Sequence, residues 1–381
     1  MIPYGRQDIR EEDIAAVAAV LASDFLTQGP AVPAFEQAVA DQVGAPHAVA
    51  VNSATSALHI ACLALGLKPG GRVWTSPNTF VASANCALYC GASVDFVDID
   101  PATWNLSPAA LATKLEHAQA HDALPDIVVA VHFGGEPCDM EAIAALAQRY
   151  GFRVIEDASH AIGARYRCQP VGDCIHSDAT VFSFHPVKII TTGEGGLITT
   201  RDAEVANHLR RLRSHGITRE PGEMAWESEG PWYYQQVELG FNYRMTDIQA
   251  ALGLSQLARL ETYIERRQQL ASRYAELLAN LPVQVQRLDP DNRSALHLYP
   301  VVVAAARRRA VFEHLRAGGI GVNVHYIPVH TQPHYRRMGF APGDFPAAES
   351  YYAGAISLPL HARLSDTEQD RVVTVLREAL R

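Results

Sequence analysis

The segment from Ser183 to Gly196 combines a lysine, hydroxyl groups and a glycine-rich turn, and these residue types can together bind a carbonyl compound. Lys188, one of three lysines in the chain, stands between the apolar residues Val187 and Ile189. An ammonium group in apolar surroundings is costly unless it is paired or neutralised, and burial lowers its pKa. A lysine made neutral in this way is a nucleophile suited to Schiff-base chemistry. The alternative is a lysine that extends from a strand end and keeps its charge in water.

A second candidate site lies directly after the apolar run 48–51, where small and hydroxyl residues open an expected helix. Thr55 and Ser56 stand at the start of this helix. Free backbone N–H groups at a helix N-terminus favour an anion, and hydroxyl groups add further donors. The alternative is an ordinary helix cap, because Ser and Thr are common at that position for capping alone.

Further candidates follow other expected strands. Asp157 comes directly after the apolar run 153–156, and His160 follows three residues later. A carboxylate placed there can pair with a protonated heterocyclic nitrogen, as an electron sink requires, although a helix cap followed by a packed histidine is the alternative. Phe80 could lie flat against an aromatic ring, but an aromatic residue is more often part of a core. Ser183 is close enough to the lysine in sequence to donate to a phosphate on the same ligand.

These candidates together match the requirements of one cofactor. A buried amine, a carboxylate for a ring nitrogen, donors for a phosphate and an aromatic face are what pyridoxal 5′-phosphate needs. The combination is far more specific than any of its members. We therefore expect a pyridoxal-phosphate site that includes Lys188.

The elements that must position these residues alternate between strands and helices. This alternation predicts right-handed crossovers and a mostly parallel sheet, in an α/β fold whose ligands bind at the carboxyl ends of the strands. The expected strands are 48–51, 72–75, 93–98, 127–132 and 153–156, and the expected helices are 11–21, 32–43, 56–65, 80–90, 108–117 and 140–150.

Beyond residue 246 the pattern changes. One long helix is expected over 246–281, followed by a strand at 295–303, a helix at 307–317, a strand at 322–327 and a helix at 365–380. This order predicts a smaller α+β unit. We accordingly expect a large cofactor-binding domain over residues 1–250, with an N-terminal segment 1–30, and a linking helix with a small C-terminal domain over 251–381.

Composition limits the class of protein. The chain has 381 residues, of which 48% are hydrophobic and 19% charged, with a formal net charge of −9. This charge argues against a nucleic-acid partner, and no apolar run is long enough to span a membrane. The N-terminus does not resemble a signal peptide, and the six cysteines show no metal-ligand spacing, so we expect reduced thiols, no metal site and a cytoplasmic protein.

Long motifs in this order resemble the DegT/DnrJ/EryC1/StrS family of sugar-nucleotide aminotransferases, within fold type I of the pyridoxal-phosphate enzymes. Ala54 stands where many members have glycine, and His160 stands where others have glutamine. The resemblance extends over almost the whole chain and is carried by Gly29-Pro30 with Phe35-Glu36, by Asn52–Leu58, Phe96–Asp100, His132–Gly135, Asp157–Gly163, Ser183–Gly196 and Gly240–Asp247, and by His325–His330.

The resemblance implies a role for each cofactor residue. Lys188 would bind the cofactor covalently and then transfer protons, Asp157 would pair with the pyridine nitrogen, and His160 would contact the oxygen side of the ring. Phe80 would stack on the ring, while the phosphate would be held by Thr55, Ser56 and Ser183.

The resemblance also implies partners. Asn242 would reach the phosphate of a neighbouring subunit, which predicts a homodimer with shared active sites. Arg244 and His325 would contact the anionic nucleotide or the carboxylate of glutamate, and Tyr326 and Gly29 would also contact substrate. For Arg244 a structural ion pair is the alternative.

Within the family, three segments most resemble members of the pseudaminic acid pathway: Ser183–Lys188, Arg213–Ile217 and Pro231–Tyr234. Those members aminate the UDP-4-keto-sugar UDP-2-acetamido-2,6-dideoxy-β-L-arabino-hexos-4-ulose at C4, with L-glutamate as donor. The alternatives are amination of a UDP-4-keto-pentose or of a GDP- or dTDP-linked sugar, a sugar 3-dehydratase, and a non-catalytic binder of the cofactor or the sugar nucleotide. Lys188 argues against the dehydratase, in which histidine replaces the lysine, and the intact set of candidate residues argues against the binder.

Overall fold

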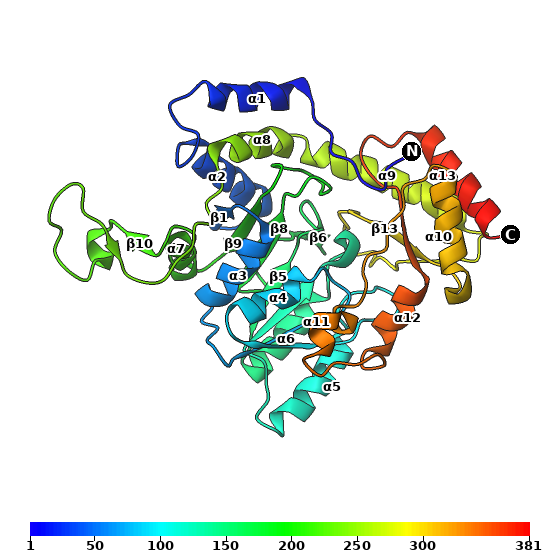
Figure 1. The fold of residues 1–381 in the computed structure, drawn as a ribbon, viewed down its shortest axis with the longest axis horizontal. Helices are drawn as coiled ribbons and strands as arrows, with labels where there is room; N and C mark the ends of the chain where they lie inside the picture. Colours follow the sequence, from blue (N-terminus) through cyan, green and yellow to red (C-terminus); the bar gives the residue numbers. More distant parts are fainter.

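The computed structural model describes residues 1–381 and is organised around one seven-stranded sheet covered by helices (Figure 1). Its strands are β1 His47–Val51, β2 Arg72–Thr75, β3 Ser93–Phe96, β4 Ile127–Val131, β5 Arg153–Asp157, β8 Ala179–Ser183 and β9 Gly196–Thr200. The order across the sheet is β1-β9-β8-β5-β4-β2-β3, and only β9 runs antiparallel to its neighbours. The prediction of an α/β fold with a mostly parallel sheet is therefore confirmed.

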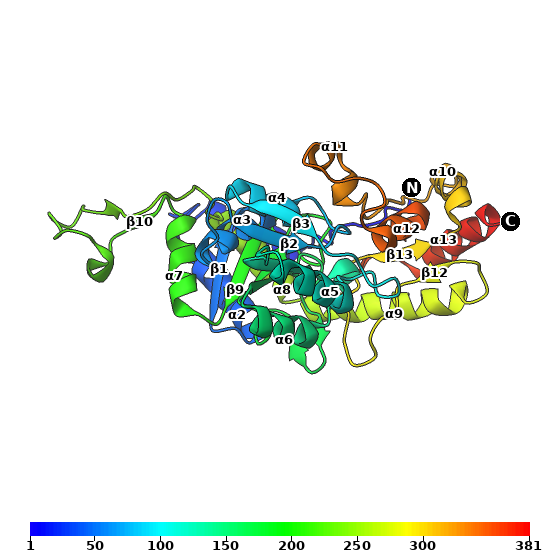
Figure 2. The same ribbon diagram turned by 90° about the horizontal axis from the view of Figure 1, so that it is seen from below.

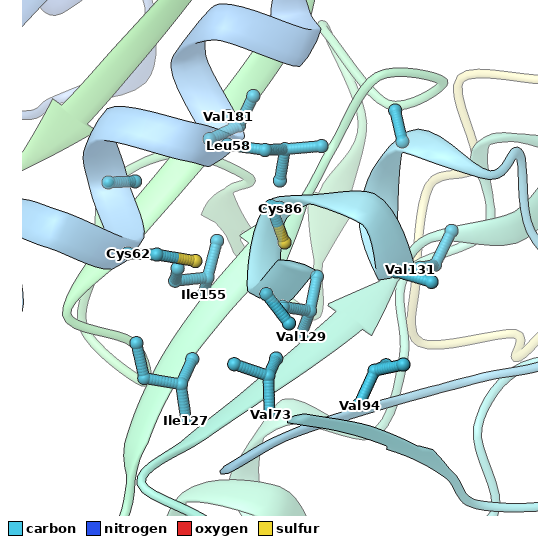
Figure 3. Packing of buried hydrophobic residues seen from close by; sticks show 14 of the residues in the cluster. Leu58, Cys62, Val73, Cys86, Val94, Ile127, Val129, Val131, Ile155 and Val181 are labelled. Atoms are coloured by element: carbon cyan, nitrogen blue, oxygen red, sulfur yellow. The ribbon is translucent and has the colours of Figure 1, made fainter. Parts of the chain in front are cut away.

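Both faces of this sheet are buried. Along β4, Ile127 and Val129 face one apolar cluster, while Val128 and Ala130 face another, because successive side chains of a strand point to opposite faces. Figure 3 shows the first face, on which helices of the crossovers pack against the strands. The helices of this part are α1 Glu11–Leu21, α2 Ala31–Val43, α3 Ala54–Ala64, α4 Ala82–Tyr89, α5 Pro108–Gln119, α6 Met140–Tyr150 and α7 Ala203–Leu212.

The prediction of a single long helix over 246–281 is wrong. The structure has two helices, α8 Asp247–Leu257 and α9 Leu260–Leu278. Arg259, between them, has φ −109° and ψ 6°, and its guanidinium donates to both oxygens of the buried Asp13 at 2.6 and 2.7 Å. Neither Gly nor Pro marks the break in the sequence. We therefore attribute the break to the contact of Arg259 with Asp13 of α1 rather than to a local signal.

The C-terminal part contains a three-stranded antiparallel sheet of β12 Gln284–Val285, β13 Tyr299–Val302 and β14 Ala355–Leu358. Its apolar core also includes Ile2, so the first residues of the chain pack against this part of the molecule. Figure 2 shows this part beside the large sheet, with α9 running beneath it. Its further helices are α10 Arg308–Ala317, α11 Pro333–Arg336, α12 Pro346–Gly354 and α13 Asp366–Ala379.

The strand expected at 322–327 is also wrong, and the one expected at 295–303 is shorter. The backbone N–H of Val324 donates to Asn323 Oδ1 at 2.8 Å and that of Tyr326 to Asn78 Oδ1 at 3.4 Å, so these groups do not enter a strand ladder. β13 begins only at Tyr299, because the N–H groups of Ala295 and Leu298 donate to Gly135 and Gly134.

One segment projects from the body. We call residues 217–239 the arm; its two short strands, β10 Ile217–Thr218 and β11 Gln235–Gln236, pair antiparallel. Both views show the arm extending away from the large sheet (Figures 1 and 2). Two further short strands, β6 Arg165–Tyr166 and β7 Gln169–Pro170, form a separate hairpin. None of the helices is both long and apolar enough to cross a membrane.

Candidate active site

A cavity of 610 Å³ lies at the carboxyl ends of β4, β5 and β8, where the strand order predicts a ligand. Val131, Asp157 and Ser183, the last residues of these three strands, all line it. The structure thus brings together residues far apart in sequence. Of the candidates from the sequence, the cavity is lined by Thr55, Phe80, Asp157, His160, Ser183, Lys188, His325 and Tyr326.

Lys188 is half-buried and lines this cavity. Its amino group forms no hydrogen bond and no ion pair. Burial lowers its pKa from 10.5 to about 8, while the carboxylate of Asp157 acts in the opposite direction. A substantial fraction of this amine is therefore neutral near physiological pH and able to act as a nucleophile.

Asp157 is a buried carboxylate fixed by two donors. Ser83 Oγ donates to Oδ2 at 2.6 Å, and the backbone N–H of Ser159 donates to Oδ1 at 3.1 Å. The hydroxyl of Thr79 in turn lies 2.7 Å from that of Ser83, which has already given its proton to Asp157, so Thr79 is the donor. The hydroxyl chain therefore fixes the orientation of the carboxylate.

His160 is held as a neutral imidazole. Burial, together with the charge of Lys188, keeps its pKa well below the usual value. The backbone N–H of Gly134 donates to Nδ1 at 3.3 Å, so the remaining proton lies on Nε2 and is donated to the Tyr326 hydroxyl oxygen at 3.1 Å. The hydroxyl proton of Tyr326 is then free to point into the cavity.

His325 is neutral as well, and both of its ring nitrogens are engaged. Burial lowers its pKa to about 3, and the charge of Lys188 adds to this effect. The amide of Asn323 donates to Nε2 at 3.4 Å, and Nδ1–H donates to Ser357 Oγ at 2.8 Å. As placed, His325 forms part of the cavity wall and has no free N–H for an anion.

The N-terminus of α3 forms an anion cradle at one end of the cavity. Thr55 and Ser183 have hydroxyl groups without a partner in the chain, and the first turn of a helix has backbone N–H groups without helical acceptors. β9 approaches this turn so closely that a Cβ at Gly196 would lie 2.5 Å from the carbonyl carbon of Ser53. Glycine at position 196 is therefore required for this arrangement.

Phe80 stands at the mouth of the cavity and is 58% exposed, which is unusual for an aromatic ring beside a pocket. Its ring lies 6.3 Å from that of Tyr326, measured between centroids. The sequence placed Phe80 at the start of a helix, whereas α4 begins two residues later, at Ala82. Its exposed face is available for stacking on a planar ligand.

Four sequence candidates lie outside this cavity. Ser56 does not line it, and its hydroxyl donates to Asn52 Oδ1 at 2.7 Å. Asn242 is exposed near the base of the arm. Gly29 and Arg244 line a second, smaller pocket of 240 Å³.

Some residues of the site were not found from the sequence. Thr79 lies just before α4 and Ser83 lies within it. No local pattern marks Ser83 as the partner of a carboxylate 74 positions away, or Thr79 as the donor to Ser83. Tyr4 and His297 also line the cavity. His297 falls in a run that the apolar pattern marked only as a strand.

The residues present fit pyridoxal phosphate. The unpaired lysine, the anchored carboxylate, the free hydroxyls at a helix N-terminus and the exposed aromatic ring surround one space of suitable size. Comparison with known proteins agrees. The family model of the DegT/DnrJ/EryC1/StrS aminotransferases matches residues 7–377.

The chain belongs to the DegT/DnrJ/EryC1/StrS aminotransferase family. Members of this family are sugar aminotransferases that depend on pyridoxal phosphate, and the chain is an enzyme of this kind with this cofactor. The resemblance stated from the sequence motifs, including the fold class, is confirmed.

Individual relatives of this DegT-family enzyme cover nearly its full length. The Bacillus subtilis spore coat polysaccharide biosynthesis protein SpsC is 41% identical, over 100% of this chain and 97% of that protein. The UDP-4-amino-4,6-dideoxy-N-acetyl-β-L-altrosamine transaminase of Campylobacter jejuni is 36% identical, over 96% and 94%. Among solved structures, Helicobacter pylori PseC, an aminotransferase involved in the biosynthesis of pseudoaminic acid, superposes with a TM-score of 0.88 at 30% identity, covering 100% and 99%.

Proposed function

We propose that this enzyme transfers the amino group of L-glutamate to C4 of UDP-2-acetamido-2,6-dideoxy-β-L-arabino-hexos-4-ulose, giving UDP-4-amino-4,6-dideoxy-N-acetyl-β-L-altrosamine. The observation that carries the transamination chemistry is the unpaired Lys188 amine, with its pKa near 8, in a cavity shared with Asp157. The choice of sugar is supported by the transaminase relative, which is 36% identical over almost the whole chain, and by the likeness to PseC.

We propose that the cavity holds the cofactor through four contacts. Thr55 and Ser183 hydrogen-bond the phosphate together with the first turn of α3. Asp157 pairs with the ring nitrogen, and Phe80 covers one face of the ring. When bound, the cofactor supplies an aldehyde carbon for the amino group and an electron-withdrawing ring.

The protein's own groups handle the protons. Lys188, partly neutral at physiological pH, would take the proton from the carbon that carries the amino group of the donor and deliver it to the carbon that the cofactor supplies. In the second half-reaction it would move a proton in the opposite sense, to C4 of the sugar. The carboxylate of Asp157, positioned by hydrogen bonds from Ser83 and Ser159, would pair with the ring nitrogen and keep its proton in place. Tyr326, whose oxygen accepts from His160 Nε2–H, presents its hydroxyl proton to the cavity.

We further propose that the working unit is a homodimer with shared sites. The arm exposes five large hydrophobic side chains, of which Trp226 at 73%, Trp232 at 71% and Leu239 at 80% are the most exposed. Apolar exposure of this extent is typical of an interface. Asn242 lies near the base of the arm and outside the cavity of its own chain, a placement that suits contact with the cavity of a second copy.

A second candidate is the amination of another 4-keto nucleotide sugar, such as a UDP-4-keto-pentose or a GDP- or dTDP-linked 4-keto-6-deoxyhexose. The observation in its favour is the 41% identity to a protein of spore coat polysaccharide biosynthesis. Both candidates use the same chemistry at Lys188. They differ only in the sugar and the nucleotide that enter.

The test is a panel of 4-keto nucleotide sugars offered to the purified protein with L-glutamate, with the aminated products identified by mass spectrometry. The UDP-linked N-acetyl hexosulose should give the highest kcat/KM. Lys188→Ala is the control that should yield no product from any sugar. Preferred turnover of a GDP- or dTDP-linked sugar would replace the first candidate by the second.

A further inference from the structure

His297 is a buried histidine whose ring nitrogens make no hydrogen bond. Nδ1 is sealed from solvent without a partner, and the ring lines the 610 Å³ cavity, with its centroid 4.5 Å from that of His160. Burial, with a further contribution from the charge of Lys188, keeps the pKa of His297 well below the usual value. The imidazole is therefore neutral and carries a single proton.

The environment decides which nitrogen carries this proton. A buried N–H group without an acceptor is rarer in proteins than a buried acceptor without a donor, so the sealed Nδ1 is the unprotonated nitrogen. The proton then lies on Nε2. Because the cavity is the open side of this ring, His297 presents an N–H donor to whatever the cavity binds.

The backbone on both sides of His297 is held in place. The N–H of Ala295 donates to Gly135 O at 2.9 Å, and that of Leu298 donates to Gly134 O at 3.2 Å. A Cβ at Gly135 would lie 2.7 Å from the backbone nitrogen of Leu296, so only glycine permits this approach.

Behind the cavity wall, Arg267 fixes the same residue. It is buried without a carboxylate partner, and its Nη1 donates to the carbonyl oxygens of Leu296 at 3.0 Å, His297 at 3.3 Å and Leu360 at 3.0 Å. A buried charge used in this way rigidifies the segment that carries His297.

The proposed amino donor brings carboxylates into a cavity that no arginine of this chain lines. Lys188 is needed for the reaction, and both ring nitrogens of His325 are engaged. Two unengaged donors lie beside His160: His297 Nε2–H and the Tyr326 hydroxyl, on rings whose centroids are 4.5 and 6.1 Å from that of His160. We propose that His297, together with Tyr326, binds a carboxylate of the amino-acid donor. This inference rests on the proposed aminotransferase function.

The test separates the two half-reactions of the holoenzyme. His297→Phe keeps a ring against His160 but removes the donor, whereas His297→Gln keeps an N–H close to the position of Nε2. In single-turnover experiments with L-glutamate, H297F should weaken the apparent affinity by about 10- to 100-fold, as expected for loss of a hydrogen bond to a charged group, with little change in the rate at saturation. H297Q should recover most of this loss.

Two further measurements complete the test. The half-reaction with the keto sugar, started from the aminated cofactor, should be unchanged in H297F. Calorimetric titration with glutarate, a dicarboxylate that cannot react, should show the same loss of affinity without any turnover.

The inference would be overturned if H297F bound glutamate and glutarate as tightly as the wild type does. It would also be overturned if H297F impaired the sugar half-reaction as much as the glutamate half-reaction. A wild-type protein that does not react with glutamate would instead refute the proposed function. Should H297F fail to fold, Tyr326→Phe removes the other donor and keeps its ring. Unchanged glutamate affinity in Y326F would then overturn the inference.

Discussion

At the scale of single residues, the decisive feature is the absence of any partner for the amine of Lys188. The other two lysines differ from it: Lys114 donates to Phe96 O and pairs with Asp95, both at 2.6 Å, and Lys68 is exposed. The apolar residues beside Lys188 in the sequence indicated a buried amine, but they could not distinguish it from a lysine whose side chain extends into water. The cavity supplies the missing distinction.

The lowered pKa of Lys188 predicts how the cofactor-free protein reacts with pyridoxal phosphate. Because only the neutral amine is a nucleophile, the rate at which the absorbance band of the lysine-bound cofactor appears should rise with pH through a midpoint near 8 and level off at higher pH. Lys188→Ala should give no band and no covalent adduct after borohydride treatment, whereas the control Lys68→Ala should behave like the wild type. A midpoint near 10.5 would show that the amine is not shielded.

Asp157 acts on the same lysine, and its removal predicts a second effect. Its charge raises the pKa of Lys188, so Asp157→Asn should move the midpoint of cofactor attachment below about 8. The variant should still bind the cofactor but transaminate orders of magnitude more slowly, because the ring loses its anionic partner. Ser83→Ala, which removes a hydrogen bond and keeps the charge, is the matched control and should show a smaller loss. Wild-type turnover in D157N would contradict this role.

At the scale of elements, the sequence predicted those with a local signal. The helix expected at 11–21 is α1, and the expected strands before Asp157 all exist. The chain reversal through β8 and β9 was not assigned, because it depends on the close approach of Gly196 to α3. The strand expected at 322–327 failed because the N–H of Val324 bonds to the neighbouring Asn323 side chain and that of Tyr326 to the side chain of the distant Asn78.

The segment 286–298, which carries His297, is also positioned by tertiary contacts. Glu136 binds this segment through hydrogen bonds. The carboxylate Oε1 accepts from Asp289 N at 3.1 Å and Asn292 Nδ2 at 3.0 Å, while Oε2 is buried without a partner. Burial raises the pKa of Glu136 from 4.5 to about 7. The folded state therefore favours the protonated form, and the chain loses stability as the pH rises from 4.5 through 7.

Glu136→Gln should remove this dependence on pH, because the amide keeps an acceptor for both donors and carries no charge. The difference in unfolding free energy between variant and wild type should shift in favour of the variant by up to about 3 kcal/mol between pH 5 and pH 8. Denaturant unfolding at both pH values measures it. If the difference in unfolding free energy between variant and wild type were the same at pH 5 and pH 8, Glu136 would not titrate in this range.

At the scale of the whole molecule, the cavity of one chain does not include every candidate residue. Asn242 is outside it, and Gly29 and Arg244 line a separate pocket. The sequence assigned all three to the site only through the family resemblance, since no local pattern distinguishes a residue that serves its own chain from one that serves a second copy. A homodimer with shared sites would reconcile their placement with their expected roles.

Shared sites predict that two inactive variants can restore each other. In a hybrid of a Lys188→Ala chain with an Asn242→Ala chain, one site lacks both residues, whereas the other combines an intact Lys188 with an intact Asn242 from its partner. Random mixing after partial unfolding should therefore recover about a quarter of wild-type activity, because half of the dimers are hybrids with one working site. A mixture of Lys188→Ala with Asp157→Asn is the matched control: both residues lie in the cavity of the same chain, so every site of that hybrid carries one defect and activity should stay near the level of the D157N parent. Recovery in neither mixture would show that Asn242 acts within its own chain and would refute shared sites, and equal recovery in both would point to refolding rather than to shared sites.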